Sequence, residues 1–302
     1  MIYYPVSSRA RFFSRLFNWA RRTTRRFHLS ETIRICRQLI HFGPWRYSII
    51  ALIQFFRGPA RWRPTDKSLM PELNARAIAS ALEANGVYKA GVLPQAFTDS
   101  MTHITDQLPA AEYHQSHEVS QHVAQIASDP AIINVVSEYL QCEPVLIESS
   151  IFVTNPETGK KPLSQNHFHY DYAGWQSLNV FVYLTDVSIT SSHHVVIAGS
   201  HKRMSLRTLI SGGVSDEHAY SSLYHDIMPI TGKAGTVFFE NVESLHKRTQ
   251  GAERRVLLNL TFTSHRNLLS HGRAHPRQLK KRDAVFAEIT EQASVKNPAA
   301  DL

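Results

Sequence analysis

The amino-acid sequence predicts an α+β protein, with helices in its first half and a β-sandwich or barrel in its second. Apolar residues recur at helical spacing up to about residue 140, and from Pro144 the chain breaks into short runs rich in β-branched and aromatic residues. Gly, Pro, Asn and Ser separate these runs, which is typical of an all-β core. The predicted strands are Val145–Thr154, Leu178–Leu184, His194–Ile197, Gly235–Glu240 and Arg255–Thr263.

The charge of the chain is concentrated at its beginning. The 302 residues contain 33 Lys and Arg against 25 Asp and Glu, a net charge of +8. Residues 1–65 contain thirteen Arg, no Lys and one acid, Glu31, so residues 66–302 carry a net negative charge. We therefore expect a basic segment, 1–65, and a separate domain, 66–302, with its β core at about 145–265. The two cysteines, Cys36 and Cys142, are too few for a disulfide framework and favour a reducing compartment.

The basic segment is predicted to form helices. Ser8–Arg22 predicts a basic amphipathic helix, because its apolar residues alternate with arginines at helical spacing. Ser30 is a candidate cap for a second helix that ends at Gly43, and a third runs from about Trp45 to Phe56 and ends at Gly58. The apolar run in this third helix is far shorter than the roughly 20 residues that span a bilayer.

Aromatic residues opposite arginines favour a helical anchor that lies in the plane of a membrane and meets anionic headgroups. A helical subdomain with a solvated Arg face and, for residues 1–30, a mitochondrial presequence remain alternatives. A basic arm of a nucleic-acid oxygenase or binder is a further alternative, but Phe and Trp on one helical face suit lipid better than a phosphate backbone. We expect a cytoplasmic protein at the inner face of a membrane, with an anionic membrane surface as partner and no nucleic acid.

A metal site is predicted from the spacing of three side chains. On a strand, residues two apart face the same way, so His169 and Asp171 can bind one metal ion together. His246, between the predicted strands at 235–240 and 255–263, can supply a third ligand from a neighbouring strand or its end. Two His and one carboxylate on one face of a metal leave three positions open, which is the arrangement of non-haem iron oxygenases. The His-x-Asp triplet alone is weak support, because the chain contains 17 His.

An ordered set of motifs around these residues strengthens the prediction of the metal site. Over about residues 145–265 the chain resembles the phytanoyl-CoA dioxygenase family in three motifs that follow one another in order. These are Ser164-Gln165 before His169-x-Asp171, the run Val180–Val187 containing Tyr-Leu-Thr-Asp-Val, and Ile197-Ala198-Gly199-Ser200-His201-Lys202. The resemblance implies a double-stranded β-helix (jelly roll) that binds Fe(II) through His169, Asp171 and His246. It also implies 2-oxoglutarate as cosubstrate and O₂ as oxidant.

The same resemblance implies an arginine for the far carboxylate of 2-oxoglutarate, which a guanidinium can bind in a bidentate way. Arg254 aligns better with the arginine of the family than Arg255, although its spacing of eight from His246 is shorter than usual, so Arg255 remains open. Asn179 occupies a position where related sequences often have Lys. It is a further candidate for binding the cosubstrate, or else a polar residue at the start of a strand.

The other histidines near these motifs are expected to be structural. His167 with His169 forms a His-x-His pair as in cupins, but Ala173-Gly174 replaces the carboxylate expected there. His193 and His194 lie in a stretch that is close to substrate in related folds, so contact with substrate is the alternative for both. Related halogenating enzymes lack the acidic ligand, so Asp171 favours hydroxylation.

These features predict a membrane-peripheral hydroxylase that decarboxylates 2-oxoglutarate to succinate while it oxidises a substrate C–H bond. The basic segment suggests an acidic lipid or glycolipid substrate. Within the resemblance, hydroxylation of the Kdo sugar of lipid A is the leading candidate, and a fatty-acyl, isoprenoid or small-molecule substrate is the alternative. A metal-free jelly-roll binding module is an alternative of another class.

Overall fold

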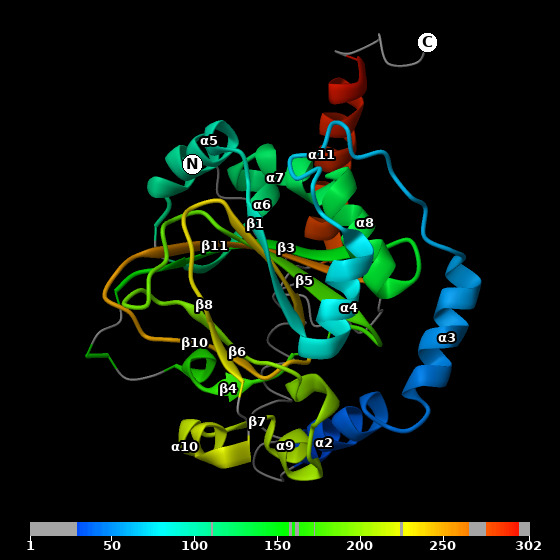
Figure 1. Cartoon of the computed structure of the whole chain (residues 1–302), viewed down its shortest axis with the longest axis vertical. Coiled ribbons are helices and arrows are strands. Elements are labelled where there is room, and N and C mark those ends of the chain that lie inside the picture. Colours follow the sequence, from blue (N-terminus) through cyan, green and yellow to red (C-terminus); the bar gives the residue numbers. More distant parts are fainter. Residues whose placement is uncertain are drawn as a thin grey trace, which may run out of the picture.

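Two antiparallel β-sheets face each other in the computed structural model (Figure 1). It describes residues 29–109, 111–156, 159–160, 163–171, 173–223, 226–265 and 276–295. The larger sheet has the order β1-β9-β5-β11-β3-β2 and the smaller sheet β7-β4-β10-β6-β8. The larger sheet contains β1 (Val87–Val92), β2 (Ala111–Gln115), β3 (Val145–Thr154), β5 (Ser177–Tyr183), β9 (Thr236–Asn241) and β11 (Arg255–Thr263). The smaller sheet contains β4 (Phe168–His169), β6 (His194–Ile197), β7 (Gly213–Val214), β8 (Ile227–Ile230) and β10 (His246–Arg248). This is the predicted jelly roll within an α+β protein.

All five predicted runs are strands, but the sheets extend beyond the expected core of 145–265. β1 and β2 form the two edges of the larger sheet. β1 is mostly half-buried or exposed, without strict alternation of apolar and polar residues, so its sequence gives little strand signal. Pairing with β9 and β3 therefore determines these edge strands more than their own sequence does.

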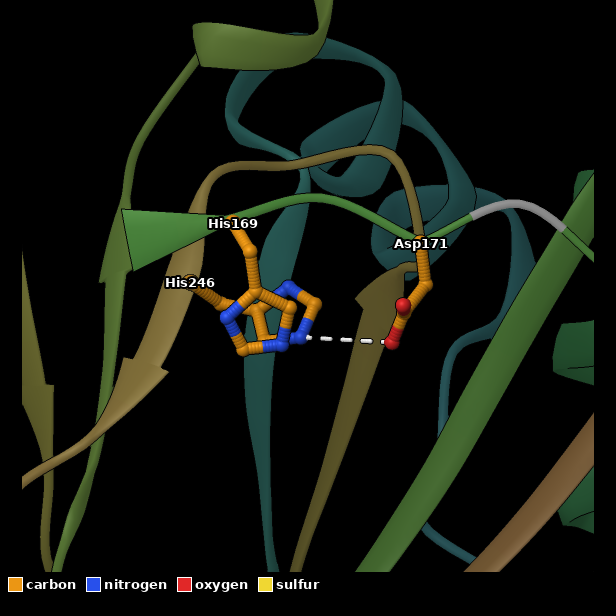
Figure 2. A group of neighbouring side chains, drawn as sticks. All are labelled: His169, Asp171 and His246. Atoms are coloured by element: carbon orange, nitrogen blue, oxygen red, sulfur yellow. Dashed lines mark ion pairs between the residues drawn. The ribbon is translucent and has the colours of Figure 1, made fainter. Parts of the chain in front are cut away.

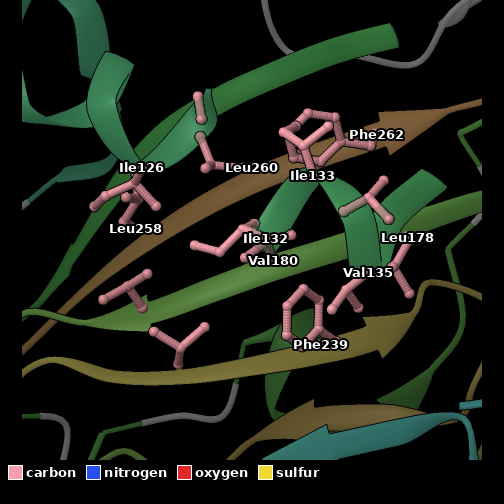
Figure 3. Close-up of a cluster of buried hydrophobic side chains, with 14 of the residues drawn as sticks. Ile126, Ile132, Ile133, Val135, Leu178, Val180, Phe239, Leu258, Leu260 and Phe262 are labelled. Atoms are coloured by element: carbon pink, nitrogen blue, oxygen red, sulfur yellow. The ribbon is translucent and has the colours of Figure 1, made fainter. Parts of the chain in front are cut away.

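Both faces of the larger sheet are covered, so its central strands are buried on each side. Leu178, Val180 and Val182 of β5 pack against helices, while Phe181 and Tyr183 pack between the sheets. Figure 3 shows the helix side of this arrangement, where residues of α8 lie over β5 and β11. The helices on this side of the larger sheet are α4 (Ala75–Asn85), α5 (Gln95–Asp106), α6 (Ser116–Val119), α7 (His122–Ala127), α8 (Pro130–Leu140) and α11 (Pro276–Val295).

A third apolar cluster covers the outer face of the smaller sheet, where Phe168, Val195 and Ile197 pack with Leu209 and Ala219. Short helices supply this outer layer: α9 (Leu206–Ser211), α10 (Asp216–His218) and the π-helix Ala219–Leu223. The space between the two sheets is therefore enclosed from both sides by packed layers.

The N-terminal helices follow the prediction where the structure describes them. α2 (Leu29–His41) and α3 (Arg46–Arg57) match the second and third predicted helices, and α3 ends at Gly58, whose φ is 74°. Ser30 lies inside α2 rather than before it. The helix predicted for Ser8–Arg22 falls outside the described residues. Among the described helices, none has the length and apolar character needed to cross a bilayer.

A buried cluster of charges attaches these two helices to the domain. His41 Nε2 of α2 lies 3.0 Å from Glu243 Oε1, and Arg46 of α3 binds the same oxygen. Arg46 also donates to the Trp175 carbonyl at 2.9 Å. Burial alone would raise the pKa of Glu243, but the His41 and Arg46 contacts outweigh it and lower that pKa.

We expect Glu243→Gln to destabilise the protein by about 3 kcal/mol at neutral pH, because it removes the negative partner of a buried ion pair. Since the folded pKa lies below the ordinary value of 4.5, the unfolded chain takes up this proton first as the pH falls. The stabilisation is therefore fully present above pH 4.5 and is lost below it. Urea unfolding at several pH values measures this difference, and a difference that stays constant from neutral pH down to acid pH contradicts the assignment.

Candidate active site

The predicted metal ligands come together where the two sheets enclose a cavity. His169 ends β4, and His246 begins β10, which pairs with β4 so that these two residues are directly opposite each other. Asp171 lies beyond the end of β4, so the prediction that it shares a strand with His169 is wrong. Its backbone N–H donates to the Val242 carbonyl at 2.8 Å, which holds this part of the chain against the loop before His246.

The geometry of these three side chains suits a single metal ion. One ligand atom from each of His169, Asp171 and His246 lies within 4.8 Å of the others. His246 Nε2 is 3.6 Å from Asp171 Oδ2, and the two imidazole rings have centroids 4.5 Å apart (Figure 2). The Asp171 side chain is 64% exposed whereas that of His246 is buried, so the group is open on one side. This donor set is that of a facial two-His, one-carboxylate site.

Backbone carbonyls orient both imidazoles toward a metal ion. His169 Nδ1 is 2.8 Å from its partner, the His167 carbonyl, and His246 Nδ1 is 2.9 Å from the Ser244 carbonyl. A carbonyl can only accept, so each Nδ1 carries the proton and donates it. In the neutral form of each ring the remaining Nε2 then carries no proton and can coordinate a metal. His167 thus contributes its backbone, and its side chain is not part of the group.

Glu240 was not predicted, yet it fixes the environment of His246. This residue of β9 is fully buried, with Oε1 3.0 Å from His246 Nδ1 and Oε2 accepting from His194 Nε2 at 2.5 Å. Burial would raise the pKa of Glu240, but attraction to His194 and His246 outweighs it and lowers that pKa to about 2. A single acid directly after the apolar run Val237–Phe239 was the available signal in the sequence.

The negative charges of Glu240 and Asp171 favour a positive charge near His246. Burial would lower the pKa of His246, but Glu240 and Asp171 outweigh this effect and raise it well above its usual value. Burial and the proximity of His246 lower the pKa of His169, which favours its neutral, coordinating form. The three side chains therefore fit a bound cation in both geometry and charge.

The family motifs support the site through the backbone. Gly199 has a φ of 69°, which suits glycine, and places Ser200 so that its Oγ accepts from the Leu245 N–H at 2.7 Å. The Gly-Ser-His turn thus supports the residue next to His246. Asp186 of the Tyr-Leu-x-Asp-Val motif accepts from Lys233 Nζ and the Ala234 N–H, so it shapes a turn away from the metal ligands.

The ligands open into a cavity of about 110 Å³ between the sheets. Its walls combine apolar, polar and charged side chains: Phe152, Gln165, His169, Asp171, Asn179, Phe181, His194, His246, Arg248, Arg255, Leu257 and Asn259. Two arginines, Arg248 and Arg255, are 5% and 4% exposed. Among these lining residues only Asp171 is acidic, and it belongs to the metal group, so the cavity is suited to an anionic ligand. A hollow of about 400 Å³ beside α9 and α10 is lined by other residues, such as Arg207 and His218.

The structure places Arg255, and not Arg254, at the cavity. Arg254 precedes β11 and points away from the cavity, where its guanidinium donates to the carbonyls of Thr105 and Leu108 at 3.0 and 2.9 Å. Arg255 is the first residue of β11, on the face of the strand that lines the cavity together with Leu257 and Asn259. Arg248 was not predicted, although its position two residues after His246 on β10 places both on the same face.

The remaining candidates divide between the cavity and its surroundings. Asn179 lines the cavity, and its Oδ1 accepts from Thr261 Oγ1 at 2.7 Å. His194 also lines it and is bound to Glu240, whereas His193 Nδ1 contacts the Ser191 carbonyl and Thr249 Oγ1, both 3.1 Å away. These contacts of His193 are of the kind expected for a structural residue, and its role stays a prediction.

Comparison with known proteins identifies the class. The family model described as phytanoyl-CoA dioxygenase (PhyH) matches residues 93–255, more than half of the chain, so the chain belongs to this family. It is therefore an Fe(II)- and 2-oxoglutarate-dependent dioxygenase. Among proteins with curated descriptions, none matches this sequence.

Solved structures share the fold. The structure of EctD from S. alaskensis with bound Fe has a TM-score of 0.53 at 19% identity, covering 74% of this chain and 87% of that one. HygX from Streptomyces hygroscopicus with iron bound has a TM-score of 0.50 at 17% identity, covering 67% and 93%. HygX with nickel and 2-oxoglutarate bound has a TM-score of 0.50 at 16% identity. At these identities the likeness concerns the fold.

Proposed function

We propose that the enzyme hydroxylates an acidic, membrane-resident lipid or glycolipid, using iron bound by His169, Asp171 and His246. The observation that carries the iron assignment is the convergence of these side chains, with both His Nδ1 atoms bound to carbonyls, at the cavity between the sheets. When bound, iron with 2-oxoglutarate and O₂ supplies the oxidising chemistry: cosubstrate becomes succinate and CO₂ as one oxygen atom enters a substrate C–H bond.

The residues of the chain bind and orient the reactants. Arg255 pairs with the far carboxylate of 2-oxoglutarate, with Arg248 as a second positive charge in the same cavity. The Ser244 carbonyl holds the His246 ring in its coordinating orientation, and Glu240 adds a negative charge beside the same Nδ1. Phe152, Phe181 and Leu257 limit access of water. Asn179 contributes a polar contact to cosubstrate or substrate.

The presence of the Asp171 carboxylate supports hydroxylation over halogenation, since a halide would need the coordination position that this carboxylate fills. The basic segment supports an anionic substrate, because its thirteen arginines within residues 1–65 can bind phosphates and carboxylates of a lipid headgroup. Among such substrates the Kdo sugar of lipid A is the leading candidate. It carries carboxylates beside a phosphorylated lipid and is exposed at the cytoplasmic face of a bacterial inner membrane.

Lipid A–Kdo from bacterial cells with and without the gene should differ by one oxygen atom in the sugar portion. The His246→Ala variant, which lacks one metal ligand, is the matched control and should give the same spectrum as cells without the gene. Mass spectrometry of the extracted glycolipid measures this. Identical masses with the active gene present exclude the Kdo candidate, while leaving the iron chemistry to be tested on other lipids.

A further inference from the structure

α3 attaches to the domain by its polar side chains. Arg46, Gln54 and Arg57 each donate to a main-chain carbonyl of the domain, at distances of 2.9, 3.0 and 2.8 Å. Their spacing of eight and three residues places them on one side of the helix. An amphipathic helix on a water-soluble domain normally directs its apolar side to the core. On α3 this side also holds Ile49, Ile50 and Ile53, which are half-buried, so only part of the apolar surface of the helix faces the domain.

Other apolar and aromatic side chains of α3 are exposed. Tyr47, Leu52, Phe55 and Phe56 are 80%, 56%, 79% and 78% exposed, and no residue of the helix is buried. Trp62, after the helix, is 68% exposed. Figure 1 shows α3 along the outer margin of the molecule, apart from the sheets. We call these five side chains the α3 face. An exposed group of large apolar side chains of this kind marks an interaction surface.

The charge of the segment indicates what this surface meets. Between residues 29 and 65 the chain has six arginines and one glutamate, and Arg37 and Arg61 are exposed. A symmetric contact with a second copy would bring these arginines toward their own counterparts, which opposes association. An anionic bilayer complements both features, since aromatic rings enter the interface while arginines meet lipid phosphates.

We infer that the α3 face docks the enzyme on the surface of an anionic lipid bilayer. α3 also contacts the loop that leads to the active site, because Arg46 binds Glu243 between β9 and β10. The neighbouring Val242 carbonyl holds the Asp171 backbone, and the loop leads directly to His246. Docking therefore fixes the orientation of the catalytic cavity relative to the bilayer. The inference deepens the proposed function and rests on it for the location of the substrate.

Co-sedimentation with vesicles tests the docking surface. Purified full-length protein is mixed with phosphatidylcholine vesicles with or without phosphatidylglycerol. We expect binding to the mixed vesicles and little to pure phosphatidylcholine. The double variant Phe55→Ser/Phe56→Ser should bind the mixed vesicles at least about tenfold more weakly, because it removes two aromatic side chains from the apolar contact. The control Ile189→Ser/Leu206→Ser changes residues that are 64% and 61% exposed elsewhere, and should bind like the wild type.

Two further measurements make the outcome decisive. Succinate release without lipid, and far-UV circular dichroism, should be the same for wild type and both double variants. Tight vesicle binding by Phe55→Ser/Phe56→Ser overturns the inference, as does a wild type that binds neither vesicle. A change of molecular mass in solution for this variant, with vesicle binding unchanged, would instead assign the face to a second copy. Since binding is measured without substrate, failure of the Kdo test does not affect it.

Discussion

Replacing any one of His169, Asp171 and His246 by Ala should abolish turnover of 2-oxoglutarate and reduce bound iron. Each supplies one of three donors lying within 4.8 Å of one another, and two donors do not hold the ion in a facial arrangement. We expect succinate release to fall at least about a hundredfold, as the loss of a first ligand should exceed the 10–100-fold effect of losing its supporting partners. Succinate assay and metal analysis of the purified variants measure both effects.

Matched controls separate loss of the metal from loss of the fold. His167→Ala lies next to the site but its side chain is not part of the metal group, so this variant should keep its iron and its activity. The three ligand variants should retain the thermal unfolding temperature of the metal-free wild-type enzyme. Full activity in any ligand variant would remove that residue from the assignment.

Replacing Arg255 by Leu should raise the KM for 2-oxoglutarate by roughly 10- to 100-fold, corresponding to the ~1.5–3 kcal/mol of a hydrogen bond to a charged group. The guanidinium is buried in the cavity, so no solvent replaces the lost contact. Arg254→Leu is the neighbouring control and should leave this KM unchanged, because Arg254 contacts the carbonyls of Thr105 and Leu108 instead. Initial rates at varied 2-oxoglutarate concentration give both values.

Arg248→Leu completes this comparison, since Arg248 lines the same cavity from β10. We expect a smaller rise in KM than for Arg255→Leu. If Arg248→Leu produces the large effect and Arg255→Leu does not, the far carboxylate is bound by Arg248. If Arg254→Leu produces it, the far carboxylate is bound by Arg254 and the assignment to Arg255 is wrong.

The metal group could be predicted from the sequence because its members lie at or next to strand ends. The two-residue spacing of His169 and Asp171, and the position of His246 between two predicted strands, were enough to select them. The spacing did not place Asp171 correctly, since β4 ends at His169 and the backbone contact to Val242 is made across the fold. The choice between Arg254 and Arg255 depended on which face of β11 lines the cavity. In Arg255–Thr263 the even-numbered residues 256–262 are all apolar, whereas Asn259 and Thr261 are polar, so the alternation already indicated the face that carries Arg255.

Other features depend on contacts that sequence spacing does not encode. The periodicity of Arg46–Arg57 predicts a helix with an apolar side but not the direction in which that side points. Its orientation, which leaves Leu52, Phe55 and Phe56 exposed, follows from hydrogen bonds to carbonyls far along the chain. Glu240 likewise owes its role to two histidines from other strands, His194 and His246. The short strands β7 and β8 gain their structure from pairing with β4 and β6.

Anaerobic titration of the purified enzyme with Fe(II) and 2-oxoglutarate tests the central assignment most directly. Chelation of protein-bound iron by the keto acid gives a visible charge-transfer absorption band without any need for the natural substrate. We expect the band to saturate at one iron per chain in the wild type and to be absent in His169→Ala, Asp171→Ala and His246→Ala. Absence of the band in the wild type, or its persistence in any of the three variants, would contradict the proposed iron site.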